Sequence, residues 1–514
     1  MSGSDSVSVS PGGGASTAGR VAGQAKTKIV ATVGPSCRPR TVLRKLVVAG
    51  VDVFRLNFAH GRHEWLAGVV ADIRGVAEEL GVPVGILGDL SGPKIRLGDL
   101  PGDELVCNEG QTVRFVRQTV ARSSPPATVA DVPGDSQPVE LTSTYDRLVD
   151  DLQVGDRVLL ADGTVALRVV EKDPGGAWAE CIVEHPGRIR SRQGINLPGV
   201  SLSTPSLTEK DLRDLQWALE QRLDYVGLSF VRSAEDVRRL ESLIASQTPA
   251  RPQIVAKIEK CEALDDLDAI IRSSDCVMVA RGDLGVEADI TRVPVLQKQI
   301  IRACNRQRVP VITATQMLDS MQYSELPTRA EATDVANAVL DGTDAMMLSA
   351  ETAIGQFPIQ AVEMMNRIAC EAEKLQESVE NDQRPRAGLR HRALEVTEAV
   401  IAGAGDTAMQ LNADLIVVVT RTGRSALAMA ERRLPVPTLA LTERPETARR
   451  MCLYWGVFPV VAPVSQMGSE ELVRFIVDWG RRTGTLRSGS RFVVVFGTQW
   501  SAHGHDIMLV HEVP

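Results

Sequence analysis

Residues 276–283 read CVMVARGD, an apolar run that ends in an arginine, a glycine and an aspartate. A surface turn or an exposed Arg-Gly-Asp adhesion sequence would each explain the aspartate. The run has the length and composition of a buried β-strand, so the tripeptide follows a strand rather than forming a loop tip, which argues against adhesion. Seven further runs of this kind occur: KIVATVG (28–34), VDVFRLNF (51–58), VPVGILGDL (82–90), DYVGLSFV (224–231), QIVAKIEK (253–260), VPVITATQ (309–316) and DAMMLSAE (344–351).

Amphipathic helical patterns lie between these runs, for example TEKDLRDLQWALEQR (208–222) and SAEDVRRLESLIASQ (233–247). Thr208 with Asp211 has the spacing of an N-terminal capping pair, as has the equivalent pair that begins at Ser233. Strands that alternate with helices predict parallel βα units. Eight such units predict an α/β fold built on a (β/α)8 barrel.

Polar residues of the eight runs gather at or near their C-terminal ends. Barrels of this class assemble their active sites on the face where the strands end. We therefore expect a site on that face, drawn from Arg55, Asn57, Asp89, Lys257, Glu259, Asp283, Thr315 and Glu351.

The remaining segments predict a multidomain chain. After a flexible, Gly/Ser-rich tail at 1–25, we expect the barrel at 26–96 and 195–375, interrupted by a small β-barrel domain at 97–194 that acts as a lid. A second α/β pattern predicts a C-terminal three-layer regulatory domain at 376–514. Its expected strands are LIVVVT (415–420), PVPTLALT (435–442), VFPVVAP (457–463) and RFVVVFGT (491–498).

Composition excludes several classes of partner. The formal net charge of −8 argues against broad capture of nucleic acid, and no apolar run reaches the ~18–20 residues that cross a bilayer. Eight scattered cysteines without C-x-x-C spacing favour a reducing, cytoplasmic location. The N-terminus lacks the apolar segment of a secretory signal, and a transit peptide is a weaker alternative.

Three charged residues on neighbouring strand ends indicate a metal site. Lys257 and Glu259 are two residues apart, so they point to one face of a strand, and Asp283 ends the next strand. Two carboxylates suit Mg²⁺ or Mn²⁺, Arg55 suits a phosphate, and Thr315 adds a hydroxyl. The alternative is a simple ion pair between Lys257 and Glu259, with Asp283 capping a helix.

Nine motifs in this order make the chain similar to the pyruvate kinase family, densely from residue 26 to about 365 and more loosely in the C-terminal third. They are ATVGPS (31–36), RLNFAHG (55–61), GPKIR (92–96), GINLPG (194–199), KIEK (257–260), ARGDLGVE (280–287), ATQMLDSM (314–321), PTRAEATDVANAVLDG (327–342) and MLSAETA (347–353).

The resemblance implies phosphoryl transfer from phosphoenolpyruvate to ADP, followed by protonation of enolpyruvate. It implies that Glu259 and Asp283 hold Mg²⁺ or Mn²⁺, that Lys257 neutralises the moving charge and that Arg55 grips the phosphoryl group. Thr315 would lie on the proton-delivery side. Gly282 joins the substrate-binding residues, and the ADP/ATP side comprises Thr32, Pro35, Asn57, His60, Trp65, Arg96 and Asp162.

Two positions depart from the potassium-dependent members of this family. Ala59 stands where those members have a serine that helps to coordinate K⁺, and Lys94 stands where they have a glutamate. Leu90 and Leu97 resemble the potassium-independent branch. An ammonium group can replace a monovalent cation, so we expect that K⁺ is not required. The alternative is that Lys94 is a solvated lysine at the hinge of the lid.

The resemblance also implies a homotetramer with an allosteric site for a phosphorylated effector. The loop Thr420, Arg421, Thr422, Gly423, Arg424, Ser425 follows a strand and opens a helix, as a phosphate-binding loop does, although an ordinary βα loop has the same composition. Two other functions remain open: a Mg²⁺-dependent barrel lyase or mutase acting on phosphoenolpyruvate or pyruvate, and a non-catalytic metabolite sensor. A sensor would be expected to lack Lys257, Glu259 or Asp283.

Overall fold

The computed structural model describes most of the chain, in residues 23–117, 138–200, 203, 205–248, 251–376, 395–497 and 506–514. Its contacts form two compact units, and each is described by itself. The first unit lies within residues 1–55, 63–86 and 317–514, and the second within residues 56–62 and 87–316.

Eight strands form a closed barrel in which the order along the chain is also the order around the barrel. The pairing is parallel, with Lys28 opposite Ala345 in one pair and Val277 opposite Val311 in another. The predicted (β/α)8 barrel is therefore confirmed. Its strands are β1 Lys28–Thr32, β2 Val53–Asn57, β3 Gly85–Asp89, β12 Tyr225–Leu228, β13 Gln253–Ile258, β14 Cys276–Ala280, β15 Val311–Ala314 and β16 Ala345–Leu348.

Burial explains why these strands are continuously apolar. Every residue of β1, β3 and β14 is buried, as expected for parallel strands covered on both faces. The covering helices begin where their sequences supply caps: the Thr208 hydroxyl accepts from the Asp211 N–H at 3.1 Å, and the Asp211 carboxylate accepts from the Thr208 N–H at 2.8 Å. The Ser233 N–H donates to Asp236 in the same way. Both predicted capping pairs are confirmed.

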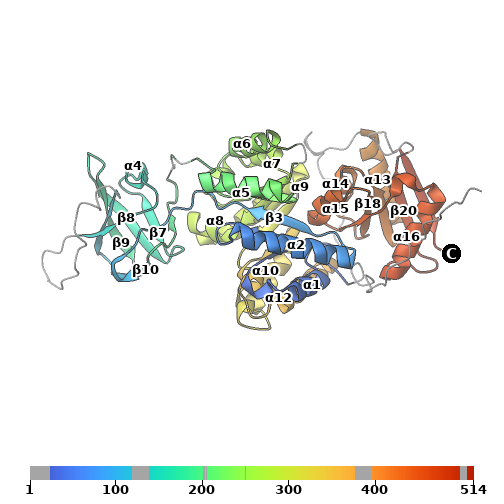
Figure 1. The fold of residues 1–514 in the computed structure, drawn as a ribbon, viewed down its shortest axis with the longest axis horizontal. Helices are drawn as coiled ribbons and strands as arrows, with labels where there is room; N and C mark the ends of the chain where they lie inside the picture. Colours follow the sequence, from blue (N-terminus) through green and yellow to red (C-terminus); the bar gives the residue numbers. More distant parts are fainter. Residues whose placement is uncertain are drawn as a thin grey trace, which may run out of the picture. The chain divides into compact units, whose positions relative to one another are not determined.

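Ten α-helices belong to the described part of the barrel. In the first unit, α12 packs beside α1 and α10 (Figure 1). Their bounds are α1 Arg40–Ala49, α2 His63–Leu80, α5 Glu209–Glu220, α6 Ala234–Ala245, α7 Leu267–Ser273, α8 Arg281–Glu287, α9 Val293–Gln307, α10 Arg329–Leu340, α11 Ala350–Ala353 and α12 Pro358–Gln376.

The insert forms two sheets, a six-stranded sheet of order β11-β7-β8-β9-β5-β6 and a two-stranded sheet β10-β4. Its strands β7 to β10 lie together in Figure 1. The runs QTVRFVRQ (111–118), DRVLLADG (156–163), VALRVV (165–170) and WAECIVEH (178–185) predict β5, β7, β8 and β9, whereas four further strands of two to four residues were not predicted. The bounds are β4 Glu104–Cys107, β5 Thr112–Val116, β6 Val139–Leu141, β7 Arg157–Leu160, β8 Val165–Lys172, β9 Trp178–His185, β10 Gly187–Arg190 and β11 Ile195–Asn196, with the short helix α4 Leu148–Asp151.

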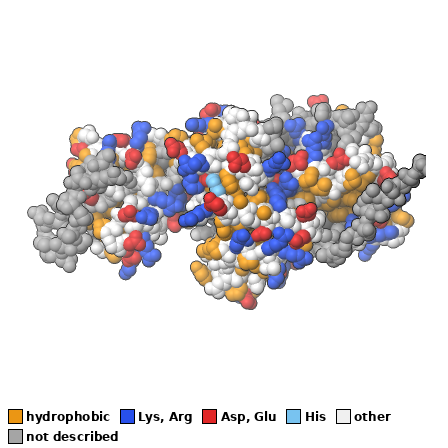
Figure 2. All heavy atoms as spheres, viewed as in Figure 1, with side chains coloured by type: hydrophobic (Ala, Val, Ile, Leu, Met, Phe, Trp, Pro, Cys, Tyr) orange, Lys and Arg blue, Asp and Glu red, His pale blue; other side chains and the backbone are white. Residues whose placement is uncertain are grey.

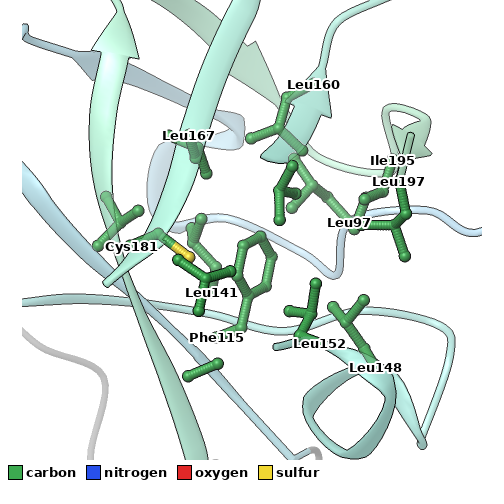
Figure 3. Close-up of a cluster of buried hydrophobic side chains, with 14 of the residues drawn as sticks. Leu97, Phe115, Leu141, Leu148, Leu152, Leu160, Leu167, Cys181, Ile195 and Leu197 are labelled. Atoms are coloured by element: carbon green, nitrogen blue, oxygen red, sulfur yellow. The ribbon is translucent and has the colours of Figure 1, made fainter. Parts of the chain in front are cut away.

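The two chain segments that enter and leave the insert pair with each other. Leu97 N–H donates to the Gln193 carbonyl at 2.8 Å, and Ile195 N–H donates to the Ile95 carbonyl at 2.9 Å. Ile95 and Ile195 also belong to the core of the insert, which centres on Phe115 (Figure 3). The paired segments therefore form the connection between the insert and its barrel strands.

The C-terminal domain is a five-stranded sheet of order β19-β18-β17-β20-β21. Four strands are parallel, as predicted, and β21 adds an antiparallel edge that the sequence analysis missed. Its elements are α13 Glu395–Gln410, β17 Leu415–Val419, α14 Arg424–Ala430, β18 Thr438–Thr442, α15 Pro445–Arg450, β19 Val457–Val461, α16 Ser469–Thr483, β20 Arg491–Phe496 and β21 Ile507–Glu512.

The predicted tail at 1–25 extends too far. Its last residues are attached to the barrel: Ala25 is buried, its N–H donates to Asn366 Oδ1 at 3.0 Å, and Asn366 donates to the Gly23 carbonyl at 3.1 Å. Residues 1–22 and 377–394 lie outside the described residues.

On the face drawn in Figure 2, acidic and basic side chains lie interspersed. Among the described helices, none combines the length and the apolar character needed to cross a membrane.

Replacement of Phe115 by alanine should loosen the insert selectively. Phe115 is completely buried in its core, so Phe115→Ala is expected to lower the free energy of unfolding by about 3–5 kcal/mol. Hydrogen exchange of β5, β8 and β9 would report the change. The control is Val106→Ala on β4, where the side chain is 49% exposed and an effect below about 0.5 kcal/mol is expected. Equal effects of the two substitutions would contradict this core.

Candidate active site

A buried lysine occupies the end of β13. Lys257 Nζ lies 2.8 Å from Glu259 Oε1 and 3.4 Å from Asp89 Oδ1, and it donates a hydrogen bond of 2.7 Å to Ser229 Oγ. Lys257 is 8% exposed and Glu259 is 1% exposed. The ion pair that the sequence left open as an alternative is therefore present, but two carboxylates share the one ammonium group.

Glu259 is buried, and burial disfavours the charged form of its carboxylate. Burial raises the pKa of Glu259, the negative charge of Asp283 raises it further, and Lys257 opposes both effects. The second carboxylate oxygen of Glu259 accepts from the Phe230 N–H at 2.7 Å. Phe230 has a φ of 53°, a left-handed conformation that aims this N–H. The cluster contains more negative charge than Lys257 neutralises.

Asp283 is brought to this cluster by α8, which begins directly after β14 and places Asp283 in its first turn. Its charge also raises the pKa of Glu287, for which burial is the largest cause. Within the described ranges, no group of three or more His, Cys, Asp or Glu side chains is arranged as metal ligands. The two carboxylates nevertheless fit Mg²⁺ or Mn²⁺, because such ions bind through one or two carboxylates and complete their shell with water and substrate oxygens.

Thr315 follows β15 in a strained conformation. Its φ is 69°, which is unusual for a β-branched residue, and the next residue, Gln316, has a φ of 51°. The Thr315 hydroxyl accepts from the Gly282 N–H at 2.7 Å and donates to the Ala314 carbonyl at 2.7 Å. The Gly282 N–H, expected to bind substrate, is engaged by Thr315 in this structure.

Two predicted residues of the first unit contact each other. Arg55, in the middle of β2, donates from Nη1 to Thr32 Oγ1 at 3.2 Å, and Thr32 donates to the Leu348 carbonyl at 2.9 Å. Pro35 is exposed and opens a short 3-10 helix, and Trp65 is half-buried on α2.

The other predicted nucleotide residues lie in the second unit. Asn57 Oδ1 accepts from the Ala59 N–H at 3.1 Å, and His60 is exposed. Arg96 donates to the Arg192 carbonyl at 3.1 Å at the connection to the insert. Asp162 lies in the turn between β7 and β8 with a φ of 53°. The structure thus brings Lys257, Glu259 and Asp283 together.

Lys94 lines a small cavity with Phe230, Lys260 and Glu287. The Lys260 and Glu287 side chains form a buried ion pair of 2.9 Å. Lys94 is exposed, and the part of the chain that the structure describes contains no ion pair or hydrogen bond of its ammonium group.

The predicted effector loop connects β17 to α14. Gly423 has a φ of 85°, and its N–H donates to Thr420 Oγ1 at 3.1 Å, so the Thr420 hydroxyl holds the loop itself. Within this loop, Thr420 and Ser425 are buried, whereas Arg421, Thr422 and Arg424 are exposed to solvent.

Comparison with known proteins agrees with this geometry. Residues 24–362 match the description "Pyruvate kinase, barrel domain", and residues 398–511 match "Pyruvate kinase, alpha/beta domain". The chain belongs to the pyruvate kinase family. Its members are phosphotransferase enzymes, and the resemblance drawn from the motifs is confirmed.

Individual relatives extend along nearly the whole chain. The chain is 40% identical to pyruvate kinase 2 of Synechocystis sp. over 493 residues, which are 95% of this chain and 79% of that protein. It is 38% identical to the pyruvate kinase of Geobacillus stearothermophilus over 95% of this chain and 80% of that one. The crystal structure of a pyruvate kinase from Cryptosporidium parvum superposes with a TM-score of 0.83 at 34% identity, covering 96% of this chain and 97% of that chain.

Two strand-end residues have other roles than the sequence suggested. Ser229 was not selected, although it also ends an apolar run; it accepts from Lys257 and donates to the Leu90 carbonyl at 2.7 Å. Glu351 was grouped with the site, but it accepts from the Leu318 and Ser349 N–H groups and so stabilises local backbone. Position at a strand end therefore does not distinguish a residue of the charged cluster from one that stabilises local backbone.

Substitution of Asp283 tests the metal site without a turnover assay. Asp283→Asn removes one of two carboxylate ligands, so Mn²⁺ affinity measured by electron paramagnetic resonance should fall at least about tenfold. The exposed Asp265→Asn is the matched control and should leave the affinity unchanged.

The pH dependence of Mn²⁺ binding adds a second readout. A proton competes with the metal for Glu259, so affinity should weaken as pH falls. Because the Asp283 charge raises the pKa of Glu259, the weakening should begin at a higher pH in the wild type than in Asp283→Asn. Identical pH profiles and affinities in the two proteins would rule out this pair as the metal ligands.

Proposed function

We propose that this protein transfers the phosphoryl group of phosphoenolpyruvate to ADP, giving pyruvate and ATP, in the last step of glycolysis. The observation that carries the proposal is the buried Lys257 ammonium beside Glu259 and Asp89, with the Asp283 charge acting on the same cluster. A fixed positive charge next to a carboxylate pair suits a reaction in which negative charge moves between oxygens.

Each residue at the strand ends has a role in this reaction. Mg²⁺ or Mn²⁺, held by Glu259 and Asp283, would supply charge neutralisation at the phosphate and enolate oxygens. Lys257 neutralises charge on the phosphoryl group and on the enolate as the phosphorus–oxygen bond breaks. Arg55 presents a planar fork of donors to the phosphoryl oxygens. Thr315 lies on the side from which the enolate carbon receives its proton, through water.

ADP would bind to the residues that match the nucleotide motifs of the family. Thr32 is the last residue of β1 and Pro35 lies shortly after it, while Asn57 is the last residue of β2 and His60 lies shortly after it. Trp65 presents an aromatic ring suited to stacking on adenine. Arg96 and Asp162 belong to the insert and its connection, and they would reach the nucleotide when the insert closes as a lid and excludes water.

We also propose that the reaction does not require K⁺. Ala59 has no hydroxyl with which to coordinate the ion, and Lys94 carries a positive charge without an ion pair in the described part of the chain. The cavity that Lys94 lines is also lined by Phe230, whose N–H bonds Glu259. Lys94 therefore shares a cavity with a residue that bonds the charged cluster.

Regulation by a phosphorylated effector at residues 420–425, a homotetrameric state and a cytoplasmic location are further proposals, which rest on the family. One contact supports communication with the barrel. Arg433, in the C-terminal domain, donates to Asp344 at 2.6 Å and to the Gly342 and Thr343 carbonyls at 2.9 and 3.2 Å, directly before β16. Movement in the C-terminal domain would therefore reach a barrel strand.

The competing functions are less consistent with the molecule. A barrel lyase or mutase would use the two carboxylates but would not need the insert or the nucleotide residues. A non-catalytic sensor would not need to keep Lys257 buried between two carboxylates, since an incompletely compensated buried charge is costly.

Pyruvate formation should proceed in a buffer free of K⁺ and Na⁺, with phosphoenolpyruvate, ADP and Mg²⁺, and added K⁺ should change the rate less than about twofold. In Lys94→Glu the positive charge is lost, so the rate without K⁺ should fall at least about tenfold and added K⁺ should restore part of it. Lys45→Glu, an exposed lysine on α1, is the control. A wild type that works only with K⁺ would refute the role of Lys94, and absence of pyruvate in all buffers would refute the activity.

A further inference from the structure

The Arg281 side chain binds the chain segment that carries Thr315. Arg281 is the first residue of α8 and follows β14 directly. Its Nε donates to the Ala314 carbonyl at 3.2 Å, and its Nη2 donates to the carbonyls of Thr315 at 2.6 Å and Gln316 at 3.3 Å. One guanidinium group therefore serves three successive carbonyls on the neighbouring strand end.

These three carbonyls belong to the strained part of the site. Thr315 and Gln316 have φ values of 69° and 51°, and two successive left-handed residues that are not glycine persist only where surrounding contacts hold them. The guanidinium itself is oriented by a further bond, from Nη1 to Gln297 Oε1 at 3.2 Å, and Gln297 is 4% exposed on α9.

The residue after Arg281 holds Thr315 from its other side. The Gly282 N–H donates to Thr315 Oγ1 at 2.7 Å, so the side-chain oxygen is oriented by residue 282 and the backbone by residue 281. The Thr315 hydroxyl in turn donates to the Ala314 carbonyl, which also accepts from Arg281. The hydroxyl and the guanidinium thus share an acceptor, and displacement of the Arg281 side chain would change where the hydroxyl points.

We propose that Arg281 is a positioning residue for the Thr315 hydroxyl and, through it, for proton delivery to the enolate. This inference rests on the proposed function. In the step concerned, the electron pair of the carbon–carbon double bond forms a new C–H bond at the methylene carbon, the enolate oxygen becomes the ketone oxygen, and the proton comes from water on the Thr315 side. Arg281 itself does not touch the substrate.

Loss of the Arg281 side chain should affect metal binding and proton delivery differently. Metal binding depends on Glu259 and Asp283, whereas proton delivery depends on the direction of the Thr315 hydroxyl. Lysine in place of Arg281 keeps the charge but offers a single ammonium, which cannot reproduce a planar fork that spans three acceptors. Arg281→Lys should therefore affect the proton step most strongly.

The test follows solvent deuterium entering the methyl group of pyruvate, in D₂O with Mg²⁺ and ATP, by NMR. Arg281→Lys is compared with the wild type and with Arg302→Lys, which changes an exposed arginine on α9. Pyruvate formation from phosphoenolpyruvate and ADP by the wild type is measured first, so that failure of the proposed function is recognised separately.

In Arg281→Lys we expect deuterium exchange to fall about 100-fold, in line with the cost of misplacing a catalytic group by about 1 Å. The Mn²⁺ affinity and the KM for phosphoenolpyruvate should stay within about threefold of the wild type, and Arg302→Lys should behave as the wild type. Exchange that is unchanged, or that falls together with metal and substrate binding to the same extent, would overturn the proposal.

A second variant guards against a folding defect. Gln297→Met removes the acceptor that orients the guanidinium and leaves Arg281 and Thr315 in place. It should lower deuterium exchange in the same direction but by a smaller factor, about three- to tenfold, with unchanged melting temperature and Mn²⁺ affinity. Normal exchange in this variant, combined with unfolding of Arg281→Lys, would count against positioning and in favour of a purely structural arginine.

Discussion

The contact between the Lys257 ammonium and the Glu259 carboxylate, 2.8 Å apart at the end of β13, is the interaction on which the site depends. Removing two charges from water is costly, and a second carboxylate, Asp89, lies 3.4 Å from the same ammonium. The Ser229 hydroxyl also accepts a hydrogen bond from the Lys257 ammonium group, which stabilises the buried positive charge. Burial raises the pKa of Glu259, the charge of Asp283 raises it further, and the negative charge that Lys257 leaves uncompensated favours a cation as the partner of this cluster.

Two unusual backbone conformations orient further polar groups of the site. Phe230 and Thr315, on different strand ends, have φ values of 53° and 69°, and each directs a polar group toward another residue of the site. Phe230 aims its N–H at Glu259, and Thr315 turns its hydroxyl toward the first residues of α8. A strained backbone persists only where surrounding contacts hold it in place. At Thr315 the Arg281 side chain provides such contacts, through its hydrogen bonds to the backbone carbonyls.

The sequence predicted what depends on local pattern and could not predict what depends on tertiary contacts. Eight apolar runs and their polar ends were sufficient for the barrel and for Lys257, Glu259 and Asp283, because a strand has a fixed period and direction. Strand β21 was not predicted from the sequence; it is an antiparallel edge strand whose residues alternate between partly buried and exposed. The roles of Ser229, Arg281 and the left-handed Thr315 follow from hydrogen bonds between neighbouring strand ends, which no local pattern encodes.

The most direct test of this account is the rate of pyruvate formation by Lys257→Met, measured together with Mn²⁺ affinity and with hydrogen exchange of β13 as a check of folding. We expect a loss of about 1,000-fold or more in rate, because the charge that neutralises the phosphoryl group and the enolate is gone, while Mn²⁺ still binds to Glu259 and Asp283. A folded Lys257→Met protein that forms pyruvate within about tenfold of the wild-type rate would contradict the central role of this ammonium group.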